Sequence, residues 1–256
     1  MIDLHNHLLG EEEPAGGLGG ALGLCAEARR DGVEEVTVTL RMAAGGGHGR
    51  ALEFERRWQE LRAQAPSGLK LHRGYEWPLE PGLAARLRAF AGEPALGEGR
   101  YLLTGLPALR VPADYERALA EVARDGYRPI IAHPECSRAL RRAEGMVARL
   151  EELGALIQID ALSLLGGYGD EVQAFADHLL GRGQVHFIAT RARPGAHRAA
   201  SLRAAREQAG RVIGRAAALR LVRDNPRAVL EDADLGAARP PGRQLSGLRT
   251  ALGHRG

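Results

Sequence analysis

Short apolar runs alternate with longer amphipathic stretches along most of the chain. Seven runs have the length and apolar character of buried strands, and each precedes a segment whose apolar residues recur with helical spacing. The predicted strands are 2–7, 35–40, 69–77, 101–106, 129–133, 155–159 and 185–190. The predicted helices are 20–30, 51–63, 81–91, 112–125, 137–153, 170–182, 197–209 and 212–222. Seven successive strand–helix units predict a parallel sheet, either open and doubly wound or closed as a barrel.

Several predicted helices are bounded by residues that favour a helix end. Gly32, Gly126 and Gly154 follow the first, fourth and fifth helices, and glycine readily adopts the left-handed conformation found there. Ser137 can cap the helix that follows the fifth strand. The apolar periodicity is lost near residue 235, where Pro and Gly become frequent. We therefore predict one domain over 1–234 and a flexible tail over 235–256.

Composition narrows the class of protein. The chain has 256 residues, of which 45% are hydrophobic and 26% charged, as in ordinary globular domains. The formal net charge is only +3, and its arginines are dispersed among acidic residues, so we expect no nucleic-acid partner. No apolar run approaches the ~20 residues that cross a bilayer, and the N-terminus does not resemble a secretory signal. Together with only two cysteines, this predicts a cytoplasmic protein, and it leaves homo-oligomerisation open.

Residues that can bind a metal lie at the ends of three predicted strands. His5 and His7 are two positions apart on the first strand, so they point to the same face. Glu76 ends the third strand and His133 the fifth. In parallel α/β folds, functional side chains gather at the carboxyl ends of the strands. Imidazoles and a carboxylate suit Mn, Zn or Fe, so these four residues predict a divalent-metal site.

Four segments in matching order and spacing resemble motifs of one family. The segments 2–7, 131–135, 158–164 and 224–227 resemble the PHP family of metal-dependent phosphoesterases, in particular its bacterial manganese-dependent protein-tyrosine phosphatases of capsule and exopolysaccharide operons. The resemblance covers 1–234. It implies a distorted (β/α)7 barrel of the PHP type, hydrolysis of phosphomonoesters by metal-activated water, and a phosphotyrosine protein as substrate.

The resemblance also assigns roles to single residues. It places His5, His7, Glu76 and His133 on metal-ligand positions of the family. Glu135 and Arg138 follow His133, and we take them as candidate catalytic residues, although Cys136 stands where phosphatase members have an arginine. No base is placed beside Cys136 by the sequence, so a thiol nucleophile is the weaker interpretation.

Three further ligand positions of the family are occupied here by arginine. Arg41 replaces a histidine after the second strand, and Arg191 and Arg193 replace an Asp-x-His motif after the seventh. A guanidinium cannot lose its proton to bind a metal, but it binds phosphate well. We therefore predict a phosphate-binding role for Arg41, Arg191 and Arg193, and fewer metal ions than intact relatives hold, or none. His48 and the acidic run Glu11–Glu13 are candidate replacement ligands.

Two functions remain open at this point. The first is a phosphoric-monoester hydrolase of the tyrosine-phosphatase type with reduced or altered activity. The second is an inactive pseudophosphatase that binds a phosphorylated or anionic ligand through an arginine-lined pocket. A nucleotide-binding protein is a weaker alternative, because the glycine-rich segment 16–20 lacks the spacing of a phosphate loop.

Overall fold

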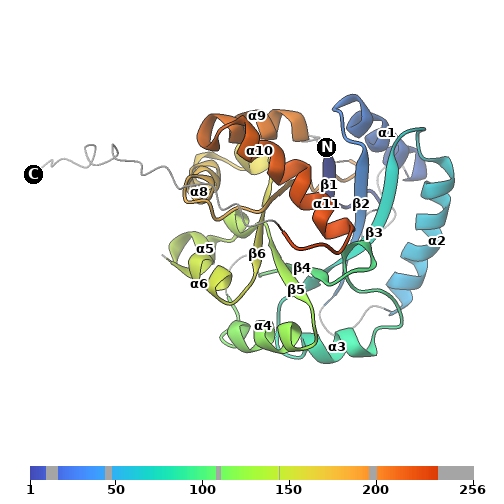
Figure 1. The fold of residues 1–256 in the computed structure, drawn as a ribbon. Coiled ribbons are helices and arrows are strands. Elements are labelled where there is room, and N and C mark those ends of the chain that lie inside the picture. Colours follow the sequence, from blue (N-terminus) through green and yellow to red (C-terminus); the bar gives the residue numbers. More distant parts are fainter. Residues whose placement is uncertain (10–16, 44–47, 108–110, 144, 196–200, 236–256) are drawn as a thin grey trace, which may run out of the picture.

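Seven parallel strands form one sheet in the order in which they occur along the chain. The structure is a computed structural model, and it describes residues 1–9, 17–43, 48–107, 111–143, 145–195 and 201–235. The strands pair in the order β1-β2-β3-β4-β5-β6-β7. Figure 1 shows them curving around a common axis with helices outside, which confirms the predicted barrel. The strands are β1 (Ile2–Asn6), β2 (Glu35–Arg41), β3 (Lys70–Pro78), β4 (Tyr101–Gly105), β5 (Arg128–Ala132), β6 (Leu156–Asp160) and β7 (Phe187–Ala189).

Helices follow every strand and cover the outside of the barrel. The first four strand–helix units each carry one main helix in the described residues, whereas the later units carry two or three. The helices are α1 (Gly17–Arg30), α2 (His48–Gln64), α3 (Leu83–Ala89), α4 (Tyr115–Arg124), α5 (Arg138–Arg142), α6 (Met146–Glu152), α7 (Ala161–Leu164), α8 (Asp170–Gly181), α9 (Leu202–Ile213), α10 (Arg215–Val222) and α11 (Asp224–Leu230). Within the described ranges, every helix is too short or too polar to span a bilayer.

The core has two parts, which follow from the alternation of side chains along the strands. Leu4, Leu103, Ile130 and Phe187 belong to a cluster that fills the barrel interior. The neighbouring positions, such as Ile131, belong to a larger cluster between the sheet and the helices. Burial on both faces explains why the strands appear in the sequence as continuous apolar runs. Polar residues in such strands are therefore conspicuous.

Several helix ends agree with the sequence, and two helical segments differ from it. Gly32, Gly126 and Gly154 have φ of 85°, 89° and 89°, which confirms the predicted helix ends. The helix predicted over 137–153 is instead α5 and α6, with Gly145 at φ 81° between them. A Gly145 in this conformation cannot continue an α-helix. The predicted flexible tail lies almost wholly outside the described residues, which end at 235.

The motif at 224–227 forms the start of α11, a helix that the periodicity did not reveal. The side-chain amide of Asn225 donates a hydrogen bond to the main-chain oxygen of His186, at 2.8 Å. Val229 of α11 belongs to the interior cluster, and Tyr101 at the start of β4 donates to the main-chain oxygen of Ala233. The motif therefore fixes the helix that closes the end of the barrel where the strands begin (Figure 1).

The first and last strands meet at a seam without a regular ladder. The main-chain N–H of Arg191 donates to the oxygen of His5 at 2.8 Å, and that of His7 donates to the oxygen of Ala192 at 2.7 Å. These two bonds continue the sheet beyond the end of β7. They place Arg191 directly beside His5 of β1 and His7, which follows β1.

A buried carboxylate reinforces the seam below these bonds. Asp3 accepts hydrogen bonds from the main-chain N–H of Thr190, at 3.0 Å, and from its hydroxyl. Burial raises the pKa of Asp3 to about 6, although these hydrogen bonds oppose the rise. The side chain of Asp3 thus substitutes for a missing strand pair between β1 and the end of β7.

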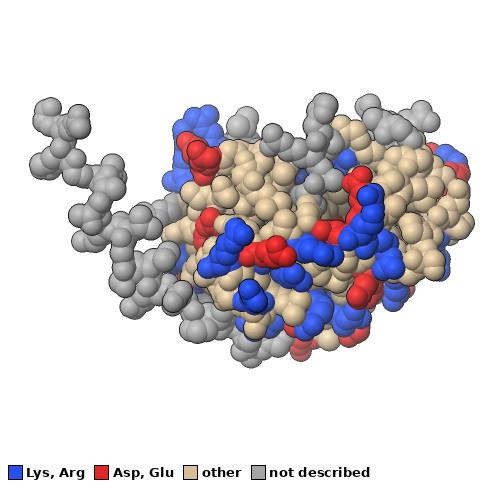
Figure 2. All heavy atoms as spheres, turned by 90° about the horizontal axis from the view of Figure 1, so that it is seen from above, with Lys and Arg blue, Asp and Glu red and all other residues tan. Residues whose placement is uncertain are grey.

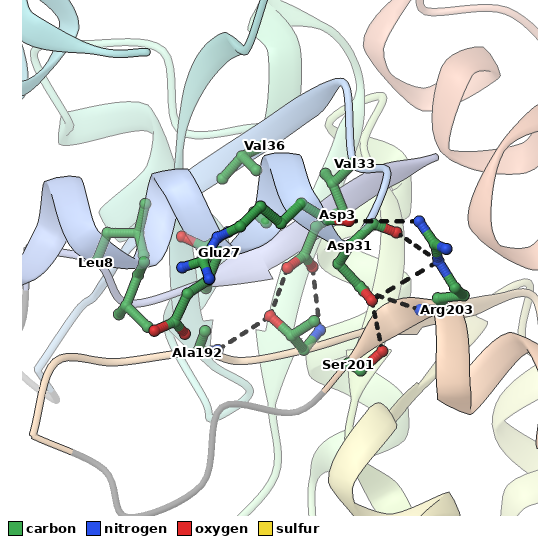
Figure 3. A pocket seen from close by; sticks show the side chains of 14 residues that line it. Asp3, Leu8, Glu27, Asp31, Val33, Val36, Ala192, Ser201 and Arg203 are labelled. Carbon is green, nitrogen blue, oxygen red and sulfur yellow. Dashed lines mark hydrogen bonds and ion pairs between the residues drawn. The ribbon is translucent and has the colours of Figure 1, made fainter.

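A cavity of about 390 Å³ adjoins the seam on the side of α1 (Figure 3). Asp31 at its rim accepts from the hydroxyl of Ser201 at 2.6 Å and from the main-chain N–H of Arg203 at 2.9 Å. Its walls also carry apolar side chains such as Val33 and Val36. These polar groups at the rim bind one another, so the contacts here join α1 to α9.

Charges on the surface are mixed, as the sequence predicted. Figure 2 shows acidic and basic side chains side by side on the face seen from above. Ion pairs such as Arg206–Glu207 and Arg227–Glu35 connect opposite charges on and near the last helices. Exposed ion pairs contribute little to stability, whereas Glu35 of the second pair is buried.

Candidate metal centre

Three predicted ligands converge at the carboxyl ends of β1 and β3. His5 Nε2 lies 3.2 Å from His7 Nε2, and Glu76 Oε2 lies 3.5 Å and 3.4 Å from these two atoms. All three side chains are buried. His133, which follows β5, approaches the other carboxylate oxygen, with its Nε2 3.2 Å from Glu76 Oε1. The structure therefore brings together all four residues that the sequence predicted as ligands.

The spacing of three donor atoms fits one ion. Ligands bonded at about 2.0–2.1 Å to a tetrahedral ion lie roughly 3.4 Å from one another. The three edges among His5, His7 and Glu76 measure 3.2, 3.4 and 3.5 Å. Two imidazoles and a carboxylate are also the donor types that Zn, Mn and Fe accept. These residues therefore fit a divalent metal by both geometry and chemistry.

Glu76 carries the negative charge of the cluster. Burial alone would raise its pKa, but hydrogen bonding to His133, His5 and His7 holds the pKa of Glu76 well below its usual range. Burial lowers the pKa of His5 to about 3, and its contact with Glu76 opposes this shift only in part. At neutral pH the centre therefore contains an ionised carboxylate beside a neutral His5 imidazole, the state that a metal requires.

A glycine makes room for this carboxylate. A Cβ atom added to Gly105, the last residue of β4, would lie 2.7 Å from Glu76 Oε1. Real Cβ atoms do not approach an oxygen that closely, so a side chain at 105 would displace Glu76. Sequence reasoning missed this residue. The only available signal was a glycine at the end of an otherwise apolar strand.

Arg41 and Arg191 line a second cavity, which adjoins the candidate ligands Glu76 and His133. A cavity of about 390 Å³ is lined by Arg41, Glu76, His133 and Arg191, among other residues. Arg41 Nε lies 3.1 Å from Glu76 Oε2, and 45% of the Arg41 side chain is exposed. Arg193, the third predicted phosphate ligand, is exposed and does not line this described cavity.

Arg191 is held far more tightly than Arg41. Only 23% of its side chain is exposed, and its Nε lies 3.6 Å from Asp160 Oδ2. Its guanidinium also lies 5.9 Å from the ring centre of Tyr168. Burial raises the pKa of Asp160, and the charge of Arg191 opposes that rise. Arg191 has φ of 50°, a conformation that non-glycine residues rarely adopt, so the seam and Asp160 together hold it at the cavity wall.

The two predicted catalytic residues lie elsewhere. Glu135 is completely buried, and its Oε1 accepts from the main-chain N–H of Asp160 at 2.8 Å and from the Ser163 hydroxyl at 2.7 Å. It connects the end of β5 to the end of β6. Arg138 is exposed on α5 and is not among the described residues that line the cavity. The structure therefore places both outside the metal cluster.

The remaining candidates from the sequence are Cys136, His48 and the acidic run Glu11–Glu13. Cys136 lines the cavity, but burial, with the charges of Glu135 and Asp160, raises the pKa of its thiol to about 12. A thiol that stays protonated is a poor nucleophile. The side chain of His48 and the acidic run Glu11–Glu13 lie outside the described residues.

The ring nitrogens that face away from the cluster have partners that sequence reasoning missed. His7 Nδ1 lies 3.1 Å from the main-chain oxygen of Thr39. His5 Nδ1 lies 2.9 Å from the side-chain nitrogen of Gln158. Gln158 was visible in the sequence as a polar residue within the apolar strand 155–159. Its role required the tertiary contact between β6 and β1.

Comparisons with known proteins place the chain in a family. The model of the family described as capsular polysaccharide synthesis, CpsB/CapC, matches residues 1–231. CapC of Staphylococcus aureus is 27% identical over 194 residues, 74% of this chain and 76% of that protein. The tyrosine-protein phosphatase YwqE of Bacillus subtilis is 26% identical over 199 residues, with the same two shares covered.

Solved structures agree on the fold. Crystal structures of YwqE from Bacillus subtilis and CpsB from Streptococcus pneumoniae, described as metal-dependent tyrosine phosphatases, include a chain that matches with a TM-score of 0.80 and 23% identity. The match covers 95% of this chain and 100% of that one. A phosphotriesterase from Mycobacterium tuberculosis matches with a TM-score of 0.55, 12% identity, and 90% and 93% of the two chains covered. With its barrel and strand-end histidines, and with a family model matching almost all of its described length, this chain belongs to the CpsB/CapC family of capsular polysaccharide synthesis proteins.

Proposed function

We propose that this protein is a phosphoric-monoester hydrolase that removes phosphate from phosphotyrosine with the help of a divalent metal held by His5, His7 and Glu76. The observation that carries the proposal is the triangle of donor atoms, with edges of 3.2–3.5 Å. The names of relatives such as YwqE support the substrate class. We expect Mn, Zn or Fe as the metal, with His133 beside it.

The cavity next to the triangle suits an aryl phosphate. Arg41 and Arg191 line it together with Glu76 and His133. Its other walls are mostly apolar and can contact an aromatic ring; they include Met42, Pro78, Leu106, Pro107 and Pro134. Arg191 is held in place by Asp160, so its charge can stabilise phosphoryl oxygens without rearrangement. A bound divalent ion supplies positive charge for those oxygens and a water of lowered pKa.

Arg41 gives a reason to expect slow turnover. Its Nε contacts the same oxygen of Glu76 that completes the ligand triangle. A guanidinium there competes with a metal for the one carboxylate. Because nearly half of the Arg41 side chain is exposed, it can turn outward when a metal binds. We therefore expect hydrolysis at a rate below that of relatives with a complete ligand set.

The direct test is metal-dependent hydrolysis of a phosphotyrosine peptide. Metal-stripped protein should be inactive and should gain activity with Mn²⁺, Zn²⁺ or Fe²⁺. His5→Ala should reduce kcat/KM by at least about 100-fold, since it removes a ligand. His178→Ala, which removes an exposed histidine on α8, should have no effect. Activity independent of every metal, or none with any of them, would overturn the proposal.

One observation favours a second function, an inactive pseudophosphatase. The contact of 3.1 Å between Arg41 and Glu76 already gives the carboxylate a cationic partner. On that alternative, the protein binds no metal but binds phosphotyrosine peptide, and Arg191→Gln weakens the peptide affinity at least about tenfold. Metal analysis combined with calorimetry of peptide binding separates the two functions.

A further inference from the structure

His5 and His7 are held differently at the ring nitrogen that faces away from Glu76. His7 Nδ1 lies 3.1 Å from the main-chain oxygen of Thr39, which can only accept a hydrogen bond. The Thr39 hydroxyl, 3.3 Å from Nδ1, already donates to the oxygen of Asn6 at 2.8 Å. His7 therefore carries its proton on Nδ1. Its Nε2 presents a lone pair to the cluster, ready for a metal.

His5 has the opposite arrangement. Its Nδ1 lies 2.9 Å from the side-chain nitrogen of Gln158, which can only donate. A neutral His5 then carries its proton on Nε2, which points toward His7 Nε2 at 3.2 Å and Glu76 Oε2 at 3.5 Å. An imidazole nitrogen that holds a proton cannot bind a metal. In this arrangement only His7 is ready to do so.

A rotation of the Gln158 side-chain amide would change which ring nitrogen of His5 carries the proton. Gln158 is 1% exposed, and its Oε1 is buried without a hydrogen-bond partner in the described part of the chain. Turning the amide by half a rotation would bring Oε1 to His5 Nδ1. The ring would then release one proton from Nε2 and take up one at Nδ1, so its charge would not change. The turn would give Oε1 a partner, take the amide nitrogen away from His5 Nδ1, and leave a lone pair on His5 Nε2 for a metal.

We infer that Gln158 is a positioning residue for the metal centre, whose amide accommodates either tautomer of His5 and so sets whether His5 can bind the ion. This inference rests on the metal site of the proposed function. A carboxamide is suited to the role because it offers a donor at one end and an acceptor at the other. Partners of this kind on metal-bound histidines typically affect metal affinity 10–100-fold.

Two substitutions of Gln158 and one matched control test the inference. Gln158→Met keeps a similar shape without donor or acceptor, whereas Gln158→Glu keeps the acceptor. Gln184→Met removes an equally buried glutamine that is bonded to Glu151, away from the centre. Calorimetric titration with Mn²⁺ should show affinity roughly 10–100-fold weaker for Gln158→Met. Gln158→Glu should stay within about threefold of the wild type, and the control should be unchanged.

The position of the proton gives a second readout, one that a merely structural role would not alter. ¹⁵N NMR of the histidine rings should find His5 protonated on Nε2 in the metal-free wild type and on Nδ1 after Zn²⁺ is added. In metal-free Gln158→Glu, the proton should already be on Nδ1. Equal Mn²⁺ affinity of Gln158→Met and the wild type would overturn the inference, as would equal loss in the Met and Glu variants.

The design also separates this inference from the proposed function. If the wild type binds none of the metals, the proposed function fails, and the tautomer of metal-free His5 still decides the role of Gln158. A proton on Nδ1 in the metal-free wild type, unchanged by Gln158→Glu, would then overturn the inference. A shift from Nε2 to Nδ1 on that substitution would support it.

Discussion

The strand ends of this barrel form two contrasting sides that share Glu76. On one side, β1, β3 and β5 supply His5, His7, Glu76 and His133, with the first three buried. On the other, the ends of β2 and β7 supply arginines, and Arg41 is nearly half exposed. On the proposed function, the histidine side binds a cation and the arginine side binds an anion. A phosphate that bridges a metal and an arginine would use both.

The contrast lies in rigidity as well as in charge. The histidine rings are fixed by partners on β2 and β6, so their positions are set before any ligand arrives. Arg191 is similarly fixed by Asp160, but Arg41 has only part of its side chain buried. A single carboxylate, Glu76, therefore contacts the buried imidazoles of His5 and His7 and the partly exposed guanidinium of Arg41. On the proposed function, the partner that Glu76 takes determines whether the protein binds a metal.

The largest expected effect comes from removing the shared charge. Glu76→Gln leaves both imidazoles in place but takes away the carboxylate ligand. We expect Mn²⁺ affinity to fall at least about 100-fold, since a direct ligand contributes at least as much as its supporting partners. Calorimetric titration measures it. An affinity close to that of the wild type would mean that the metal lies elsewhere and that the two sides do not compete for Glu76.

The next effect concerns the seam that joins the two sides. The pKa of Asp3 is about 6 in the folded chain and 3.8 ordinarily, so between these pH values the folded state holds more protons than the unfolded state. The free energy of unfolding should therefore decrease as pH rises through this range, by about 3 kcal/mol from this group. Asp3→Asn removes the titration. Between pH 4 and pH 7, denaturant unfolding should show the stability of the wild type falling by about 2 kcal/mol relative to that of the variant, since part of the change lies below pH 4.

A stability difference between the wild type and the Asp3→Asn variant that stays constant across that range would contradict this account. It would mean that Asp3 keeps an ordinary pKa despite its burial. The seam would then be held by the main-chain bonds alone.

Removing Arg41 should strengthen metal binding. Arg41→Ala takes away the cation 3.1 Å from Glu76 Oε2. We expect Mn²⁺ affinity to rise about tenfold, which is roughly 1.4 kcal/mol for a partly screened charge. Arg62→Ala, which removes an exposed arginine of α2, is the matched control. Weaker metal binding in Arg41→Ala would show that the arginine supports the centre rather than competing with it.

The smallest effect is expected at Cys136, which lies between the two sides on the cavity wall. Because its pKa is about 12, less than one thiol in a thousand is ionised at pH 8. Cys136→Ser should change phosphatase activity less than about twofold. In a Cys25→Ala background, alkylation of Cys136 by iodoacetamide should keep rising up to pH 10 without a plateau. Loss of activity on substitution would instead indicate a covalent mechanism.

The sequence by itself determined the repeating architecture and the candidate metal ligands. Buried strands must be apolar on both faces, so a polar residue at a strand end stands out, and this revealed His5, His7, Glu76 and His133. The alternation of strands and helices determined a parallel sheet, because parallel strands need a crossover such as a helix between them. Closure of that sheet into a barrel was implied by the family motifs, because periodicity is identical in open and closed sheets.

Only the tertiary structure decided which way the remaining polar side chains face. Glu135 and Arg138 follow His133 in the sequence, yet one is bonded to Asp160 and Ser163 and the other is exposed. The space that Gly105 leaves for Glu76, and the contact of Gln158 with His5, join residues from strands that are far apart in the chain. Side-chain direction along a strand follows a local rule. The partner across a barrel depends instead on closure and on the seam, which no local pattern encodes.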